Sequence, residues 1–431
     1  MVVIKPFKGF RYNPELVGDL AQVVTPPYDV ISAAQQQMFE NRSDYNYVHL
    51  ILPFGDDDTK YESSANLLAQ WIEESVFMQD PDESIYIYAH HFNYGGKEYD
   101  RLGFVALLEL EELGNNILPH EKTFPKPMED RLKLMAANHS NLEQIFLIYD
   151  DKRKTIESML VDAIEGISET ERFTDDDGGI QQLYRISDES KIAKLVDAMQ
   201  DQQCVIADGH HRYKTSLEFM NQHPEIPAAR YRLVTFVNSM NDGLLVLPTN
   251  RLLYNLGKVD VKKVFQRLGK YFTVQEMPAM QDIIEQMASM SSPRAIGDEK
   301  HVVFGMQCNF NDKKYLLSLK DFGSIEEFFP DCSDAYKHLD LAILHKVVIE
   351  QCLGIRDEDL EIDKNVDYVK GVEETIRRLK DKTKYQMGFF VNAASIDEIF
   401  QVTRAGEIMP PKTTFFYPKM YSGLVFWKME R

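Results

Sequence analysis

The stretch CVIADGHHRY, residues 204–213, constrains the fold more than any other part of this sequence. An apolar run predicts a short strand at Cys204–Ala207, and a helix is predicted over Tyr213–Asn221. Gly209 lies between the two, where a glycine permits a tight turn of the backbone. A strand that passes through a glycine turn into a helix is typical of a mixed α/β fold.

The same turn carries a candidate anion site. The first N–H groups of a helix are unpaired and lie at the positive end of its dipole. His210, His211 and Arg212 occupy that position, and the Arg212 guanidinium suits phosphate oxygens. Thr215 follows one turn later. We therefore expect these side chains and the Gly209 backbone to hold a di- or triphosphate.

Two other interpretations of this stretch stay open. In the first, Asp208 caps the helix and the two histidines lie on the surface. In the second, Asp208, His210 and His211 bind a metal ion, because all three are metal-ligand types. Adjacent side chains rarely bind one metal together, which disfavours the metal site.

A second candidate segment is LPHEKTFPKPMEDR, residues 118–131. It is a proline-rich loop, and reactive side chains are commonly held on loops. Glu121 is a candidate general base beside His120, and Arg131 adds positive charge. The alternative is a solvated polar loop with no role in chemistry.

Two further segments add candidate contacts. In MPPKTTFFYPK, residues 409–419, two prolines precede Lys412 and stiffen the backbone there. In TPPYDV, residues 25–30, Asp29 follows a rigid proline turn. The alternatives are a packed strand with extended lysines for the first segment and a purely structural turn for the second.

Charge and cysteine content exclude several classes of function. The net charge is −20, and an acidic surface repels the backbone phosphates of nucleic acids. A small anionic ligand remains compatible, since a pocket needs only a few local cations. None of the four cysteines forms a CxxC pair, so neither a zinc site nor a disulfide framework is expected. We find no signal peptide and no apolar run of 18 residues, which predicts a cytoplasmic protein without membrane contact.

The chain has 431 residues, enough for two or three domains. We expect an N-terminal α/β region at 1–98, a core at 99–258 and a C-terminal α/β domain at 259–431. Within these, residues 84–94 and 101–110 predict a hairpin with a turn near Gly95 and Gly96. The other predicted elements include a strand at 46–53, a helix from Ser32 to about 40, and a helix at 339–354 ending at Gly354.

Several of these segments carry a family resemblance. PPYDVIS, LPHEKT, DRLKLM, ADGHHRYKTSLEF, LPTNRLL and MPPKTTFFYPK follow the order seen in bacterial and archaeal proteins grouped as domain of unknown function 1015. The resemblance runs from Phe7 to Leu424. Asn250 departs from the family pattern, which has a histidine there, whereas Arg251 matches and is implied as a substrate or phosphate contact.

The core of that family is similar to the ParB/sulfiredoxin superfamily. Members bind nucleotide phosphates with a Gly-x-x-Arg stretch at a helix start, which here corresponds to Gly209–Arg212. The free-serine kinases of this group have a Pro-His-Glu stretch with a proposed glutamate base, matched here by Pro119, His120 and Glu121. His210 stands where sulfiredoxin needs a cysteine, so sulfinic-acid repair is not implied.

The resemblance and the residues together predict a kinase. It would transfer a phosphoryl group from ATP or ADP, with Mg²⁺, to a small hydroxyl compound such as free L-serine. Glu121 would accept the hydroxyl proton, and Asp208 would orient a histidine or hold Mg²⁺ through water. Arg131 and Lys412 would add cations from other segments.

Two other functions are kept as alternatives. One is a nucleotide-dependent regulatory switch, as in the ParB-type partition proteins. The other is a metal-dependent hydrolase built on His120, Asp208, His210 and His211. The sequence leaves the oligomeric state open.

Overall fold

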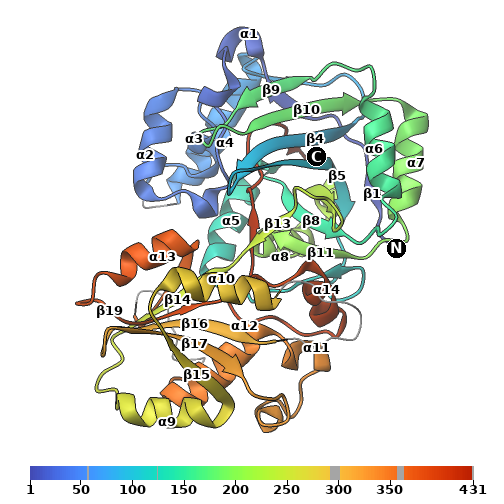
Figure 1. Ribbon diagram of the computed structural model, residues 1–431. Coiled ribbons are helices and arrows are strands. Elements are labelled where there is room, and N and C mark those ends of the chain that lie inside the picture. Colours follow the sequence, from blue (N-terminus) through green and yellow to red (C-terminus); the bar gives the residue numbers. More distant parts are fainter. Residues whose placement is uncertain (56–57, 124, 292–300, 357–363, 430–431) are drawn as a thin grey trace. The chain divides into compact units, whose positions relative to one another are not determined.

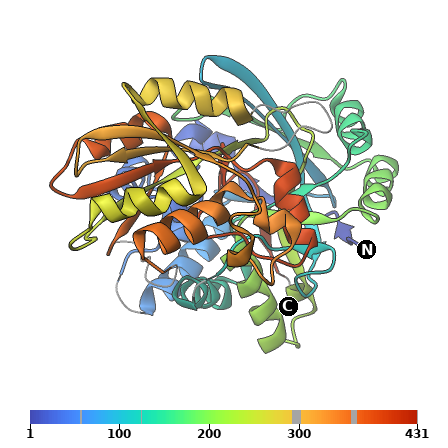
Figure 2. The same cartoon turned by 60° about the horizontal axis from the view of Figure 1, so that its bottom comes forward.

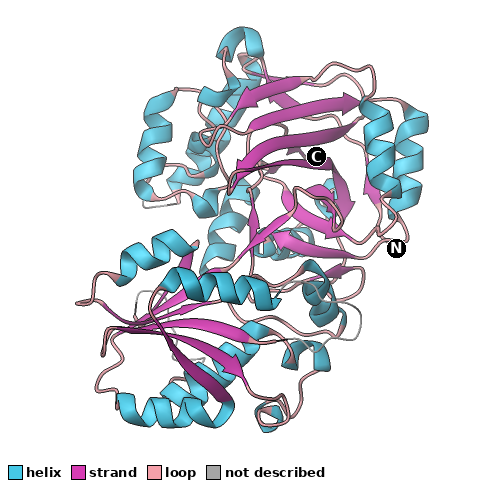
Figure 3. Cartoon of the chain, in the orientation of Figure 1, coloured by secondary structure: helices cyan, strands magenta, loops and turns pink. Residues whose placement is uncertain are grey.

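The structure is a computed structural model that describes residues 1–55, 58–123, 125–291, 301–356 and 364–429 (Figure 1). The chain forms two compact units. Unit 1 comprises Met1–Leu245 and Pro418–Arg431, and unit 2 comprises Val246–Tyr417. Each unit combines helices and strands, which confirms the predicted mixed α/β class (Figure 3).

This division differs from the three domains expected from the sequence. The expected boundary at 98/99 falls inside strand β5 (Lys97–Glu109), which pairs with β4 (Ile85–Tyr94). A boundary there would cut through a hairpin and its hydrogen bonds. The hairpin itself was predicted, and its turn at Gly95 and Gly96 has positive φ at both glycines.

Unit 1 is built on a nine-stranded sheet. The strand order is β6-β11-β8-β12-β5-β4-β10-β9, and β1 pairs with β5 outside this path. β11 is parallel to β6 and β12 is parallel to β8, while the other pairs are antiparallel. The remaining strands of the sheet are β1 (Ile4–Lys5), β6 (Ile117–Leu118), β8 (Ile145–Tyr149), β9 (Glu171–Thr174), β10 (Ile180–Ile186), β11 (Cys204–Asp208) and β12 (Tyr231–Asn238). Two short pairs lie outside it: β2 (Phe10–Tyr12) with β3 (Phe77–Gln79), and β7 (Ser140–Asn141) with β21 (Trp427–Lys428).

Three helices share one apolar core with this sheet. α6 (Thr155–Ile164) and α7 (Glu189–Met199) lie side by side (Figure 1). Their buried residues pack with strand residues such as Ile87 and Phe104. α8 (His210–Gln222) adds residues of its inner face to the same cluster. The start of α8 is therefore held firmly against the sheet.

The other helices of unit 1 are short or peripheral to that core. One prediction fails here: residues 46–53, expected as a strand, contain helix α3 (Val48–Ile51). The Asn46 side chain accepts from the Val48 N–H at 3.1 Å and starts the turn. A short apolar run does not by itself distinguish a buried strand from a buried helix. The remaining helices are α1 (Pro14–Val17), η1 (Leu20–Gln22), η2 (Tyr28–Val30), α2 (Ala33–Arg42), α4 (Thr59–Glu73), α5 (Pro125–Asn138) and η3 (Pro227–Arg230). α2 begins after Ser32, as predicted, with a capping box.

Unit 2 contains a six-stranded antiparallel sheet in the order β15-β17-β16-β19-β14-β18. α10 (Met280–Ser291) and α13 (Val372–Leu379) lie over one face of the sheet, and α9 (Val261–Tyr271) and the π-helix η5 (Leu344–Leu353) lie over the other (Figures 1 and 2). The predicted helix at 339–354 is α12 continued by η5, and it ends at Gly354 in the left-handed conformation.

The strands are β13 (Leu245–Leu247), β14 (Thr249–Tyr254), β15 (Phe272–Met277), β16 (Val303–Cys308), β17 (Lys313–Leu319), β18 (Val366–Lys370), β19 (Tyr385–Phe390) and β20 (Phe415–Tyr417). The helices are α9 (Val261–Tyr271), α10 (Met280–Ser291), η4 (Glu326–Phe328), α11 (Asp334–Lys337), α12 (Asp340–Ile343), η5 (Leu344–Leu353), α13 (Val372–Leu379) and α14 (Ile396–Arg404).

Among the described helices, none is both long enough and apolar enough to cross a lipid bilayer.

Candidate functional site

The turn between β11 and α8 requires glycine. Gly209 has φ 94°, and a Cβ at this position would lie 3.1 Å from Nε of Arg212. α8 begins at His210, three residues before the predicted start, and no side chain caps it. Asp208 is thus the last residue of β11, and the interpretation of Asp208 as the helix cap is wrong.

Two cations converge on Asp208. Arg212 donates to one carboxylate oxygen and Lys419 donates to the other. Arg212 also donates to the main-chain oxygen of Gln144 at 2.6 Å. Burial alone would lower the pKa of Arg212, but Asp208 and further nearby carboxylates raise it overall. A fixed cluster of charge therefore lies at the start of α8.

The loop that carries His120 joins the same place. The backbone N–H of His120 donates to Nε2 of His210 at 3.2 Å, and the two rings meet edge to face with centroids 4.5 Å apart. Both residues are buried. Burial lowers the pKa of His120, and the neighbouring Glu121 carboxylate opposes that shift. Glu121 itself is partly exposed, one residue beyond this contact.

Asp29 belongs to the same electrostatic group. Asp29 lies in η2 and is exposed to solvent. Desolvation by the surrounding protein raises the pKa of Asp29, and the Asp208 carboxylate raises it further, while Arg212 and Lys419 act in the opposite direction. The charges of Asp208, Arg212 and Lys419 thus all act on the Asp29 carboxyl, although Asp29 forms no ion pair with any described residue.

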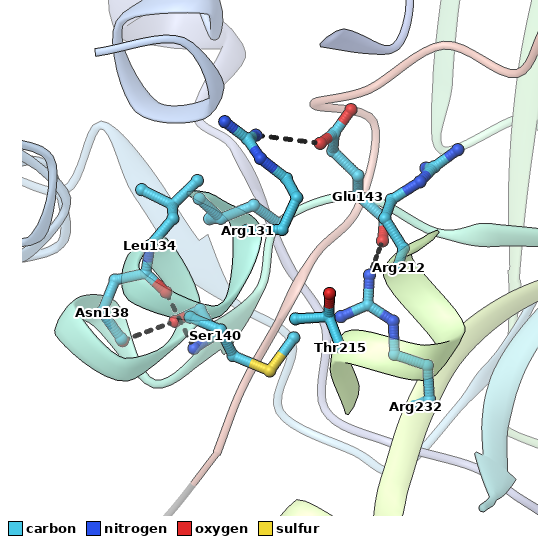
Figure 4. Close-up of a pocket in the computed structure, with 10 residues that line it drawn as sticks. Arg131, Leu134, Asn138, Ser140, Glu143, Arg212, Thr215 and Arg232 are labelled. Carbon is cyan, nitrogen blue, oxygen red and sulfur yellow. Dashed lines mark hydrogen bonds and ion pairs between the residues drawn. The ribbon is translucent and has the colours of Figure 1, made fainter. Parts of the chain in front are cut away.

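Arg131 and Thr215 lie elsewhere, at a small cavity of about 30 Å³ beside α8 (Figure 4). Thr215 is buried, and its hydroxyl is 3.4 Å from the main-chain oxygen of Met128. Arg131 pairs with Asp130 and lies 4.1 Å from the ring centroid of Tyr28. The cavity has room for about two water molecules, so no nucleoside fits in it. Its lining residues are Arg131, Leu134, Met135, Asn138, Ser140, Leu142, Glu143, Arg212, Thr215 and Arg232.

Two of the predicted contacts belong to unit 2. Arg251 is 0% exposed, and its guanidinium donates to the main-chain oxygens of Thr249, Pro411 and Lys412. The predicted phosphate contact by Arg251 is therefore replaced by a packing role, because the folded unit 2 encloses its side chain. Lys412 has φ 54° and supplies one of those oxygens.

Residues 4–342 match the family described as "Protein of unknown function (DUF1015)". This chain belongs to the DUF1015 family. No curated protein matches it. The matched range includes the segments with Asp29, Glu121 and Arg212. Lys412 and Lys419 lie beyond it.

Solved structures show distant similarity to this DUF1015 protein. A mutant free serine kinase in complex with AMP has 15% identity and a TM-score of 0.35, covering 70% of this chain and 84% of the other. A conserved hypothetical protein from Pyrococcus furiosus has 14% identity and a TM-score of 0.33, covering 71% and 89%. C-terminally truncated SbnI from Staphylococcus aureus has 11% identity and a TM-score of 0.34, covering 71% and 82%. We draw no functional conclusion from similarities at this level.

Asn250, where the resemblance implied a histidine, is buried and hydrogen-bonded within unit 2. Its side-chain amide donates to Thr375 Oγ1 at 2.9 Å and to the Gly371 oxygen at 3.2 Å. Its carbonyl accepts from the Val391 N–H at 3.2 Å. In this DUF1015 chain the position joins two strands and a helix within unit 2.

The sequence analysis missed Lys419, Glu143 and Arg232. Lys419 is the second lysine of residues 409–419, and nothing in that segment distinguishes it from Lys412. Glu143 accepts from the Tyr28 N–H at 3.0 Å and ties the loop of Asp29 to the sheet. No sequence signal indicates Arg232, which is an ordinary strand residue until the fold buries it.

No group of three or more His, Cys, Asp or Glu side chains among the described residues is arranged to hold a metal ion. Both oxygens of Asp208 already accept from cations. This geometry does not support the hydrolase alternative built on His120, Asp208, His210 and His211.

Proposed function

We propose that this protein is a nucleotide-dependent small-molecule kinase. It transfers a phosphoryl group from ATP or ADP to a hydroxyl group, and free L-serine is the first candidate acceptor. The observation that carries the proposal is the contact between His120 and His210, which links the loop of Glu121 to the start of α8. The residue next to the candidate base is thereby hydrogen-bonded to the first residue of the candidate phosphate site.

The phosphate site is the start of α8. An uncapped helix start with a glycine turn favours anions, and Arg212 and Lys419 add two cations. Asp208 holds both cations before any substrate binds. Groups fixed in this way stabilise a transferring phosphoryl group without further rearrangement.

The transfer step balances as a direct displacement. The acceptor hydroxyl oxygen forms a bond to the terminal phosphorus, and the bond from that phosphorus to the bridging oxygen breaks. AMP or ADP leaves with the electron pair of that bond, and Glu121 takes the hydroxyl proton. Mg²⁺ would neutralise charge on the phosphates, and Asp29, which forms no ion pair among the described residues, is the carboxylate best suited to hold it through water.

The first experiment is phosphorus NMR of the full chain with ATP or ADP, Mg²⁺ and L-serine, run against the same mixture without serine. A phosphomonoester signal that requires serine supports the kinase. Nucleotide loss without dependence on serine would instead favour the regulatory switch. No turnover of either nucleotide with any hydroxyl acceptor would overturn the proposal.

The base assignment is tested by Glu121→Gln. We expect the transfer rate to fall at least a hundredfold, within the usual contribution of a general base. The matched control is Glu129→Gln, because Glu129 is exposed on α5 and pairs only with Lys133 among the described residues. An unchanged rate in Glu121→Gln would exclude Glu121 as the base.

A further inference from the structure

Arg232 is a buried cation that forms no ion pair in the part of the chain that the structure describes. It lies in β12, its residue is 3% exposed, and no carboxylate of the described residues lies within ion-pair distance of it. Burial lowers the pKa of Arg232 to about 9; the charge of Arg212 adds to this shift, and the carboxylate of Glu143 opposes it. A guanidinium in this range is still protonated at neutral pH. Burying such a charge without a counter-ion is costly.

The hydrogen bonds of Arg232 are also incomplete. Nη2 donates to the main-chain oxygen of Glu143 at 2.6 Å. Nε is buried and has no hydrogen-bond partner among the described residues. Arg232 and Thr215 both line the cavity described above (Figure 4).

A second donor faces the same cavity. The Oδ1 atom of Asn138 accepts from the Ser140 N–H at 3.0 Å, which fixes the orientation of the amide. Its Nδ2 atom is buried and has no partner in the described part of the chain. Asn138 and Arg232 therefore present unused donors to one small space.

The other charged groups around the cavity are compensated. Arg131 pairs with Asp130, and Arg212 pairs with Asp208. The Glu143 carboxylate accepts from the Tyr28 N–H and the Ser422 hydroxyl, and it lies 3.8 Å from Arg131. Arg232, by contrast, forms no ion pair among the described residues, and the nearby Glu143 carboxylate offsets its charge only in part.

We propose that this cavity binds one small inorganic anion, held by Arg232, Asn138 and Thr215. A cavity lined by unused hydrogen-bond donors and by a guanidinium without an ion pair favours an anion over a neutral ligand. The volume of about 30 Å³ suits a halide or a single oxyanion group and excludes a nucleoside. Arg212 lines this cavity and also lies at the start of α8, but Arg232 and Asn138 take no part in the proposed phosphate site, so the anion site does not depend on the proposed kinase activity.

The test measures thermal unfolding of the full chain by circular dichroism at constant ionic strength. Sodium gluconate, whose anion is too large for the cavity, is replaced stepwise by sodium chloride or, in a second series, by sodium phosphate. We expect the midpoint to rise and then saturate with at least one of these anions, because a ligand that binds the folded state stabilises it. A third series adds the anion at saturating ADP. An additive rise indicates a free inorganic anion, and loss of the rise indicates that a nucleotide phosphate fills the same cavity.

Variants separate this site from general salt effects. Arg232→Gln is expected to raise the half-saturating anion concentration at least tenfold, and Thr215→Val is expected to raise it by a smaller factor. Arg230→Gln is the control, because Arg230 is an exposed arginine two residues away. If Arg232→Gln does not fold, bromide-soaked crystals of the unaltered chain should show anomalous density in the cavity. No saturable effect, an equal effect in Arg232→Gln and Arg230→Gln, or no bromide density would each overturn the proposal.

Discussion

The backbone N–H of His120 donates to Nε2 of His210 at 3.2 Å. An imidazole nitrogen that accepts a hydrogen bond carries no proton, so Nδ1 of a neutral His210 bears the ring proton. The contact thus sets one tautomer at the first residue of α8. It also satisfies a buried main-chain donor in a loop between β6 and α5.

Removing this acceptor should destabilise the fold. His210→Ala leaves the N–H of His120 buried and unpaired, which costs about 1–3 kcal/mol. We expect the free energy of unfolding in urea to fall by that amount. His223→Ala, at the other end of α8, is the control and should change it by less than about 0.5 kcal/mol. Equal effects in the two variants would show that the contact contributes nothing.

The turn at Gly209 gives a second prediction. Gly209→Ala must adopt φ 94° and place its Cβ 3.1 Å from Nε of Arg212. We expect a loss of about 1–3 kcal/mol in the free energy of unfolding and a weaker affinity for ADP, measured by calorimetry.

Gly269→Ala is the matched control for that variant. Gly269 lies inside helix α9, and a Cβ there would meet no atom within 4 Å. Alanine is the better helix former, so this variant should gain about 0.5–1 kcal/mol. A loss of stability in both variants would contradict the conformational explanation.

Local signals predicted much of unit 1. The apolar run before Gly209 predicted β11, and the glycine pair at 95–96 predicted the turn between β4 and β5. These features are encoded by neighbouring residues, through turn chemistry and alternation. Residues 46–53 were predicted wrongly because their apolar run carries no period, and the Asn46 side chain selects the helix.

The charged cluster was only partly predictable for a different reason. Asp208 and Arg212 are four residues apart on one turn, so a sequence motif contains both. Lys419 comes from a segment 211 residues later, and only the tertiary fold places it against Asp208. The same holds for the cavity at Arg232, whose lining spans residues 131–232. Contacts between residues that are far apart in the sequence produce no recognisable spacing of residues within it.

Lys419 is predicted to matter for nucleotide binding. Lys419→Met removes one of the two cations on Asp208 and leaves that carboxylate facing Arg212 alone. We expect the affinity for ADP to fall at least tenfold, or about 1.4 kcal/mol, by calorimetry. The exposed Lys8 supplies the control, and Lys8→Met should bind ADP as the unaltered chain does. Unchanged affinity in Lys419→Met would remove Lys419 from the phosphate site.

The adjacent histidines His90 and His91 predict opposite pH effects. His90 is 2% exposed, and burial lowers its pKa from 6.5 to about 4, assisted by Arg101 and opposed by Asp175. The unfolded chain therefore binds a proton that the folded chain excludes between these values. Stability from His90 is present above pH 6.5 and is lost as the pH falls towards 4, on the order of 3 kcal/mol in total.

His90→Gln should flatten the pH dependence of the unfolding free energy between pH 6.5 and 4, measured by urea titration at several pH values. His91 is exposed, and its hydrogen bond to Asp100 raises its pKa, so any stability it contributes is present at low pH and is lost as the pH rises past 6.5. His91→Gln should leave the slope between pH 6.5 and 4 close to that of the unaltered chain, because solvent screens an exposed pair. If His90→Gln keeps the full slope, the acid sensitivity of this fold originates in other groups, such as the buried carboxylates paired with arginine.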